Sequence, residues 1–321
     1  MKAIVYTRYG PPDVLQIAEV EKPIPNENQL LIKVHAASVN AGDYRVRGGK
    51  PFLLRLVIGG LLKPKDSRLG SDVAGRVEAV GENVKQFRPG DEVFGCAHGA
   101  FAEYVLAKEA NLALKPANRS FEEAAAVPVA ALTALQGYRY AGGIQPGQKV
   151  LVQGASGGVG IFAVQLAKLF EAEVTAVCSP RNLEMARSMG ADHVIDYTRE
   201  DFTKSGQQYD LIYAVNGYHS LLAYKRALSP QGIYVCAGGT LPQIFQAMLL
   251  GSLMSEKGGK KISSMGIAKV NQEDLVYLGE LLDSGKIAPV IDRSYPLREI
   301  AEAFRYVEER HAQGKVVITV V

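Results

Sequence analysis

The ten residues LVQGASGGVG, from Leu151 to Gly160, decide how this chain is read. An apolar run leads into four glycines within seven residues, and the apolar sequence IFAVQLAKLF follows them. A buried strand, a tight turn and a helix with an apolar face are the expected structures. We therefore predict that the chain turns sharply here, between the strand and the helix of a βαβ unit.

Such a loop is typical of a site for the pyrophosphate of a dinucleotide. Missing side chains at Gly157 and Gly158 let backbone N–H groups approach phosphate oxygens, and Gly160 lets the helix pack close to the sheet. Ala155 stands where G-x-G-x-x-G has its first glycine and still keeps the turn small. The backbone expected to hold the pyrophosphate is that of Ser156, Gly157, Gly158, Val159 and Gly160. The alternative is a tight turn that binds no ligand.

The sequence around this loop alternates between strand-like and helix-like patterns. The strand-like runs that follow the loop are AEVTAVCS, HVIDY, YDLIYAV and GIYVCAGG. Strands that alternate with helices imply crossover connections and a parallel sheet. The predicted fold class is therefore α/β, with a Rossmann doubly wound parallel sheet.

The sequence before Ser120 has a different texture. Short strand-like runs are separated there by the turn sequences YGPPD, KPIPNEN and FRPGD, which predicts an antiparallel, barrel-like β unit. Ser120, with Glu123 three residues later, forms a capping-box pattern that marks a helix start. After about Gly258 two helical patterns precede a last strand, KVVITVV, which we expect to return to the β unit.

Composition narrows the class of protein. A chain of 321 residues suggests two domains, and 47% hydrophobic with 21% charged residues is ordinary for a soluble globular protein. The net charge of +3 comes from 36 basic and 33 acidic residues that are interspersed, so no dedicated nucleic-acid surface is expected. The longest apolar runs are interrupted and too short to span a bilayer.

The cysteines and the first residues predict a cytoplasmic location. Cys96, Cys178 and Cys236 are far apart and form no C-x-x-C motif, which indicates reduced thiols. The first residues, MKAIVYTRYG, enter a strand at once and leave no room for a signal peptide.

The end of the second strand of the βαβ unit, AEVTAVCS, predicts which nicotinamide cofactor binds. A site for NAD expects Asp or Glu there, to bind the ribose 2′-OH. This chain has VCSPRN instead, and no acid occurs before Glu184. Ser179 and Arg181 stand where the 2′-phosphate of NADP would lie, so we predict NADPH in preference to NADH. Ser179 is also a good helix cap before Pro180, and both roles are compatible.

Four stretches together resemble a known family. LGSDVAGRVEAVGENVKQFRPGDEVFG, AAAVPVAALTALQGY, VLVQGASGGVG and GADHVIDY are similar to the medium-chain dehydrogenase/reductases, in particular to their zinc-free quinone oxidoreductase branch. The ending resembles mitochondrial and chloroplast-envelope quinone oxidoreductase homologues. The resemblance implies a GroES-like catalytic domain at 1–119, completed by 286–321, and a Rossmann NADP-binding domain at 120–285. It also implies an active site in the cleft between the two domains.

The resemblance allows the zinc-ligand positions of zinc-dependent relatives to be compared with the residues of this chain. Zinc-dependent relatives have a cysteine and the histidine of a GHE motif as ligands, where this chain has Asn40 and, in GSD, Ser71. A tetrahedral N/S site cannot be assembled from these residues, so no metal is expected. Without a Lewis acid, reduction of a polarised double bond is favoured over alcohol oxidation.

The predicted function is therefore NADPH-dependent, zinc-independent reduction of quinones or of the C=C bond of α,β-unsaturated carbonyls. The alternatives are an NAD(P)-dependent alcohol dehydrogenase or ketone reductase, and a cofactor-binding homologue that is not an enzyme.

The resemblance also suggests roles for single residues. It places Asn40 near the nicotinamide ribose or the substrate carbonyl, and the alternative is an ordinary loop asparagine. Tyr44 follows it and is a candidate donor to the enolate or proton source, and the alternative is a surface tyrosine. The further cofactor contacts that it implies are Thr133, Tyr197, Ser264, Gly266 and His311. For Thr133 a hydroxyl bonded back within its helix is the alternative, for Tyr197 a strand-end aromatic, and for His311 a cation at a helix end.

Two apolar segments, 51–62 and 241–254, are unusual for loops. They are expected to line a pocket for a bulky apolar quinone or enone. A core helix, a dimer face and a peripheral contact with membrane lipid are the alternatives. We expect a homodimer without a transmembrane segment.

Overall fold

The computed structural model describes residues 1–50, 52, 55, 60–310 and 312–320. It divides into two compact units, which we call unit 1, Met1–Ala130 with Val270–Val321, and unit 2, Ala131–Lys269. Each unit has its own sheet and its own hydrophobic core.

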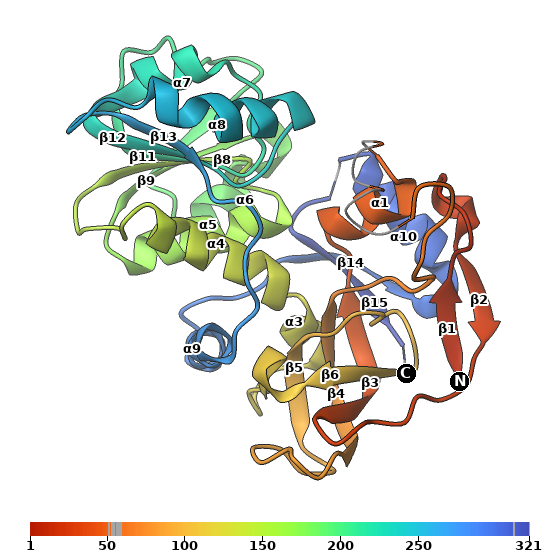
Figure 1. Ribbon diagram of the computed structural model, residues 1–321. Helices are drawn as coiled ribbons and strands as arrows, with labels where there is room; N and C mark the ends of the chain where they lie inside the picture. The colour runs from red at the N-terminus through yellow and green to blue at the C-terminus, as the bar shows by residue number, and fades with distance from the viewer. Residues whose placement is uncertain (51, 53–54, 56–59, 311, 321) are drawn as a thin grey trace. The chain divides into compact units, whose positions relative to one another are not determined.

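Unit 2 contains a six-stranded parallel sheet in the order β10-β9-β8-β11-β12-β13 (Figure 1). The strands are β8 (Lys149–Gln153), β9 (Glu173–Cys178), β10 (His193–Asp196), β11 (Tyr209–Ala214), β12 (Leu228–Cys236) and β13 (Lys261–Ser264). Taken along the chain this is the order 3-2-1-4-5-6 of a doubly wound sheet, so the predicted α/β architecture is confirmed. The order reverses between β8 and β11, where ligands of such sheets bind.

Helices cover both faces of this sheet. Figure 1 shows α7 (Leu221–Ala227) and α8 (Leu241–Met254) on one face, with α4 (Pro128–Tyr140) and α5 (Gly158–Leu169) on the other. A further helix of the unit, α6 (Leu183–Ser188), connects β9 to β10. The strands are buried on both faces because every crossover helix places apolar side chains over them.

Unit 1 is built around a mainly antiparallel sheet in the order β14-β15-β3-β4-β5-β7, with β6 also paired to β3. Its strands are β3 (Gln29–Ser38), β4 (Asp72–Val80), β5 (Glu92–Cys96), β6 (Tyr104–Lys108), β7 (Leu112–Leu114), β14 (Ile291–Pro296) and β15 (Lys315–Thr319). A separate hairpin joins β1 (Lys2–Val5) to β2 (Gln16–Glu19). The helices are α1 (Ala41–Gly48), α3 (Phe121–Ala125), α9 (Gln272–Asp283) and α10 (Ile300–Glu308).

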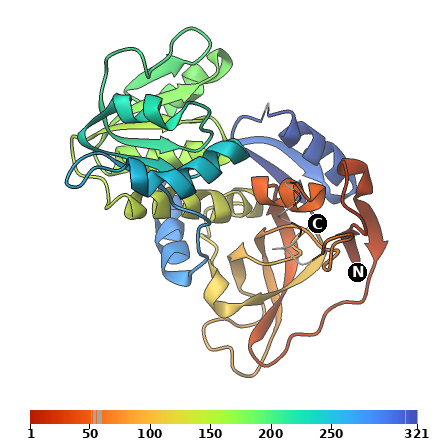
Figure 2. The same cartoon turned by 45° about the horizontal axis from the view of Figure 1, so that its top comes forward.

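The last strand returns to the amino-terminal sheet as predicted. β15 pairs antiparallel with β3, with Val317 opposite Ser38, and the blue carboxyl-terminal segment lies beside the red and orange strands in Figure 2. The capping box at Ser120 also forms, since its hydroxyl accepts the N–H of Glu123 and the Glu123 carboxylate accepts the N–H of Ser120.

Helix α9 belongs to unit 1, although the sequence-based boundaries assigned residues 272–283 to the dinucleotide-binding domain. It packs against β7, and the guanidinium of Arg119 donates to the carbonyl of Leu282 at 2.9 Å. These contacts explain why unit 1 begins again at Val270.

The two apolar segments differ in what the structure describes. Segment 241–254 is α8, which buries Gln243, Ala247 and Gly251 and exposes Phe245, Met248, Leu249 and Leu253. Helix α8 is therefore buried on one side only. Its exposed apolar side is compatible with a pocket lining, a dimer face or a lipid contact, and these stay predictions. Most of segment 51–62 lies outside the described residues. In the described part of the chain no helix is both long and apolar enough to cross a membrane.

Candidate functional site

The glycine loop connects β8 to α5 at the point where the strand order reverses. Gly154 has φ of +82°, a left-handed conformation that favours glycine, and the N–H of Gly157 donates to its carbonyl at 3.1 Å. Ala155 is completely buried, has no positive φ, and donates its N–H to the carbonyl of Val177. Because Gly154 takes the strained conformation, the next position can be alanine.

Two glycines of the loop are needed for different reasons. A Cβ at Gly160 would lie 2.1 Å from the carbonyl oxygen of Gly154, so the helix can pack on the loop only without a side chain there. At Gly157 the φ of −82° is ordinary, and an added Cβ would lie 3.5 Å from the Gly154 carbonyl oxygen, an ordinary contact distance. The fold therefore has room for a methyl group at Gly157, and glycine leaves that space open at the start of α5.

The start of α5 is suited to an anion. Gly157 is its N-cap and supplies no side-chain acceptor, so the first N–H groups of the helix are not capped by that residue. A helix start without a side-chain cap, with open space at Gly157, is suited to an anion such as the predicted pyrophosphate. The backbone from Ser156 to Gly160 would hold that group.

Ser179, Arg181 and Tyr197 gather at the carboxyl ends of two paired strands. β9 and β10 are in register with Cys178 opposite Asp196, and the N–H of Tyr197 donates to the carbonyl of Cys178 at 3.4 Å. Ser179 and Tyr197 are therefore neighbours, and the Tyr197 ring is half exposed. Arg181 is exposed on the short 3-10 turn Pro180–Asn182.

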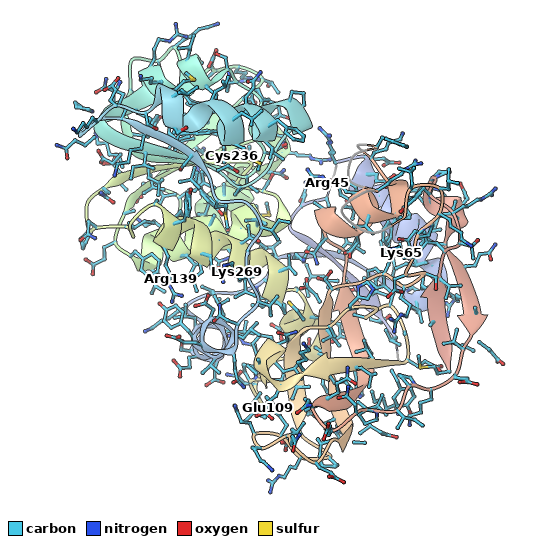
Figure 3. The ribbon with its side chains drawn as sticks, in the orientation of Figure 1. Arg45, Lys65, Glu109, Arg139, Cys236 and Lys269 are labelled. Carbon is cyan, nitrogen blue, oxygen red and sulfur yellow. The ribbon has the colours of Figure 1, made fainter. Side chains whose placement is uncertain are left out.

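The remaining predicted cofactor contacts are placed less closely together. Ser264 ends β13 opposite Cys236, the thiol labelled in Figure 3, and Gly266 follows with φ of +72°. Both lie at the carboxyl edge of the sheet, as the glycine loop does. Thr133 lies on α4, where its carbonyl accepts the hydroxyl of Tyr213 at 2.7 Å. His311 lies outside the described residues.

A buried polar network lies beneath the carboxyl edge of the unit 2 sheet, and it was not predicted from the sequence. Gln153 ends β8 and is 1% exposed, and its Oε1 accepts the hydroxyl of Tyr224 at 2.6 Å. That hydroxyl in turn accepts the N–H groups of Tyr218 and His219, which holds the loop after β11. Burial raises the pKa of Tyr224, so its hydroxyl stays a donor. The available signal was a glutamine at the end of the apolar run KVLVQ.

A second polar cluster is buried in unit 1, around the completely buried carboxylate of Asp72. Its Oδ2 accepts the hydroxyl of Ser38 at 2.6 Å, the amide of Asn40 at 2.8 Å and the ammonium of Lys315 at 3.2 Å. Its Oδ1 accepts the N–H of Val129 at 2.8 Å. Lys315 also donates to the Oδ1 of Asn40 at 2.7 Å, so charge and hydrogen bonds are matched within the cluster.

This cluster bears on the two predicted catalytic residues. The Asn40 amide already has protein partners, Lys315 on its oxygen and Asp72 on its nitrogen, which indicates a positioning role. Tyr44 is half buried on α1 and packs its ring against the core of unit 1. No hydrogen bond of its hydroxyl occurs within the described part of the chain. Arg45, labelled in Figure 3, follows it on the same helix.

Asp43 is a buried acid at the start of α1. One carboxylate oxygen accepts the N–H of Asn40 at 2.8 Å, and the other lies 3.4 Å from the hydroxyl of Ser71. Burial raises the pKa of Asp43 to about 7, helped by the nearby charge of Asp72 and opposed by the Asn40 N–H and Lys315. Asp43 therefore caps the start of α1 and has a pKa of about 7.

The side chains that the structure describes do not favour a metal site. Among the described residues, no three His, Cys, Asp or Glu side chains are grouped so that they could hold a metal ion. The Lys315 ammonium contacts the oxygen of Asn40 at the position where zinc-dependent relatives have a ligand. A divalent cation bound by Asn40 would lie beside this positive charge.

Comparison with known proteins matches both parts of the chain. Residues 26–117 match the alcohol dehydrogenase GroES-like domain, and residues 189–318 match the zinc-binding dehydrogenase family. The GroES-like architecture that the sequence suggested for the β unit is thereby confirmed.

Individual proteins match over the whole chain. A 2-methylene-furan-3-one reductase from Solanum lycopersicum is 38% identical over 99% of this chain and 79% of its own length. The quinone oxidoreductase from Coxiella burnetii has a TM-score of 0.88 at 32% identity, covering 100% of this chain and 99% of that one. Escherichia coli quinone oxidoreductase complexed with NADPH has a TM-score of 0.85 at 27% identity, covering 100% of both chains.

The raised pKa of Asp43 predicts a pH dependence of stability. An acid whose pKa rises from 3.8 to about 7 on folding binds more protons in the folded chain than in the unfolded one. Its contribution to the free energy of unfolding therefore falls as the pH rises through that interval. In Asp43→Asn, which retains an acceptor for the Asn40 N–H, this loss should be absent. Urea unfolding of both proteins across the interval should show the variant gaining stability relative to wild type. Parallel curves would contradict the assignment.

Proposed function

Because the chain belongs to the quinone oxidoreductase-like branch of the medium-chain dehydrogenase/reductase superfamily, and is thus an NAD(P)H-dependent oxidoreductase, we propose that it reduces quinones or the C=C bond of α,β-unsaturated carbonyls with NADPH. The observation that carries the proposal is the start of α5 at the switch point of the sheet, where Gly157 supplies no side-chain cap and, among the described residues, an added Cβ would contact only the Gly154 carbonyl oxygen. The relatives named 2-methylene-furan-3-one reductase and quinone oxidoreductase support the substrate class.

The residues of unit 2 fit two parts of a dinucleotide, the pyrophosphate and the 2′-phosphate. The backbone from Ser156 to Gly160 would bind the pyrophosphate through uncapped N–H groups. Ser179, Arg181 and Tyr197 would surround a 2′-phosphate, because no acid stands at the end of β9 to compete for the ribose. Arginine matches phosphate through its planar fork of donors, which supports NADPH over NADH. When bound, the reduced nicotinamide supplies the hydride.

In unit 1 the proposed chemistry needs a donor and not a metal. Addition of hydride to the carbon β to a carbonyl places negative charge on the oxygen, which one well-placed donor can stabilise. We assign this donor role to the Tyr44 hydroxyl, because the Asn40 amide is engaged by Asp72 and Lys315. Asn40 then acts by positioning the start of α1, the helix that carries Tyr44.

The proposed substrate is apolar. The exposed side of α8, with Phe245, Met248, Leu249 and Leu253, offers apolar contact area that a soluble protein uses for binding. A homodimer and a cytoplasmic location also remain proposals that rest on the sequence.

Cofactor preference can be tested by substitution. Arg181→Ala should weaken NADPH binding by about tenfold or more, since a charge-assisted hydrogen bond is worth roughly 1.5–3 kcal/mol. NADH lacks the 2′-phosphate, so its affinity should hardly change. Fluorescence titration with both cofactors measures this. Equal losses for NADPH and NADH would assign Arg181 to the structure of the turn.

Zinc independence can be tested by elemental analysis. The purified protein should contain no stoichiometric zinc, and its activity should survive chelation, because Lys315 places a positive charge at Asn40. Stoichiometric zinc that is lost together with activity would contradict this reading of the cluster.

Reaction type can be tested by isotope transfer. With NADPH deuterated at C4 and an enone, mass spectrometry should find deuterium at the β-carbon of a saturated ketone. The Tyr44→Phe variant should give the same product with kcat about a hundredfold lower, the usual effect of losing one preorganised donor. Deuterium on the carbinol carbon of an allylic alcohol would show carbonyl reduction, and the alcohol dehydrogenase alternative would replace the proposal.

A further inference from the structure

Two residues that usually cap helices bond to each other at the end of β9. Ser179 is the N-cap of the turn Pro180–Asn182, and Asn182 is the N-cap of α6, yet neither side chain accepts a capping hydrogen bond. Instead, Nδ2 of Asn182 donates to Oγ of Ser179 at 2.9 Å. A side-chain cap is worth about 1 kcal/mol, so both residues forgo a common local stabilisation for this contact.

The Asn182 side chain is also buried at a cost. It is 3% exposed, and within the described part of the chain its Oδ1 has no hydrogen-bond partner. A buried acceptor without a partner is destabilising, and native structures contain few of them. Apolar side chains of similar size would fill this place without that cost. The amide group is therefore explained by what its Nδ2 does for Ser179.

The contact determines what the Ser179 hydroxyl can do. A hydroxyl has one proton to donate and two lone pairs to accept with. Because Asn182 donates to the oxygen, one lone pair is occupied and the hydroxyl proton must point to another acceptor. Ser179 itself is only half buried, so this proton can reach a group that approaches the end of β9.

The neighbouring strand brings further suitable groups to the same place. Tyr197 follows β10 directly beside Ser179, and its ring is 49% exposed. Arg181 is exposed on the turn between Ser179 and Asn182. An acceptor with several oxygens and negative charge matches this surrounding better than a sugar hydroxyl does.

We infer that Asn182 is a positioning residue that sets the preference for NADPH, by holding the Ser179 hydroxyl as a donor to the 2′-phosphate. The inference rests on the proposed cofactor site, and it adds a residue that does not contact the cofactor. Its effect passes through Ser179, so the two residues must be coupled energetically.

A double-mutant cycle tests this coupling. Dissociation constants of NADPH and NADH are measured by fluorescence titration for wild type, Ser179→Ala, Asn182→Leu and the double variant. Each single variant should weaken NADPH by about tenfold, the range expected for a hydrogen bond to a charged group, and leave NADH unchanged. The double variant should bind NADPH no more weakly than Ser179→Ala does.

Two further variants secure the interpretation. Asn182→Asp keeps the side-chain shape, but its ionised carboxylate can only accept a hydrogen bond and would accept that of the Ser179 hydroxyl. This variant should therefore lose the NADPH preference at least as strongly as Asn182→Leu. Ser188→Ala, whose hydroxyl bonds to the Met185 carbonyl at the far end of α6, should change neither affinity.

Each contrary outcome has a distinct meaning. If wild type prefers NADPH and both Asn182 variants retain the full preference, this inference is overturned while the proposed cofactor stands. Equal losses of NADPH and NADH, or additive losses in the cycle, overturn it too, since Asn182 would then act through the fold or independently of Ser179. A wild-type protein that binds both cofactors equally would overturn the proposed cofactor preference together with the inference.

Discussion

The contact of α5 with its own loop is the constraint on which unit 2 depends. The helix begins directly above the carbonyl of Gly154, and a single methyl group at Gly160 would lie 2.1 Å from that oxygen. With no atom there, the first turn of α5 lies at the carboxyl edge of β8, next to the switch point of the sheet. The open space at Gly157 and the N–H groups without a side-chain cap lie at this first turn. Any bulkier sequence would move the helix and remove the anion site.

Unit 1 depends on a different kind of constraint, a buried charge. The Asp72 carboxylate accepts four donors that come from β3, the start of α1, β15 and α4. An unpaired buried charge is very unfavourable, so these four segments must assemble together for the carboxylate to be satisfied. The cluster thereby joins residues that are up to 275 positions apart in sequence. It also holds Asn40 in place. Asp43 lies near this cluster, and its pKa is raised to about 7 mainly by burial, with a smaller contribution from the charge of Asp72.

Unit 2 places two polar side chains where apolar ones would pack more simply. Gln153 and Asn182 are each at most 3% exposed, and each keeps one polar atom without a partner among the described residues. Such groups reduce stability but orient their neighbours, Tyr224 in one case and Ser179 in the other. Buried polar contacts of this kind can define one arrangement among several of similar packing. Gln153 ends β8 and Asn182 follows β9, so both lie near the carboxyl edge of the sheet, where the cofactor is proposed to bind.

The sequence by itself determined the elements that depend on local pattern. The glycine loop, the alternation of strands and helices and the cap at Ser120 are set by residues close together in the chain, so their periodicity and turn chemistry were enough. The placement of Ser179 beside Tyr197 could also be anticipated, because parallel strands end at one edge. Other features had no local signal. Lys315 reads as one charge in an apolar strand, Asp72 as an acid after a serine, and Asn182 as an ordinary helix cap. Only the tertiary structure decided that Lys315 neutralises Asp72, that Asn40 is engaged by both, and that Asn182 bonds to Ser179. The physical reason is that burial and pairing of polar groups depend on which distant segments the sheets bring together.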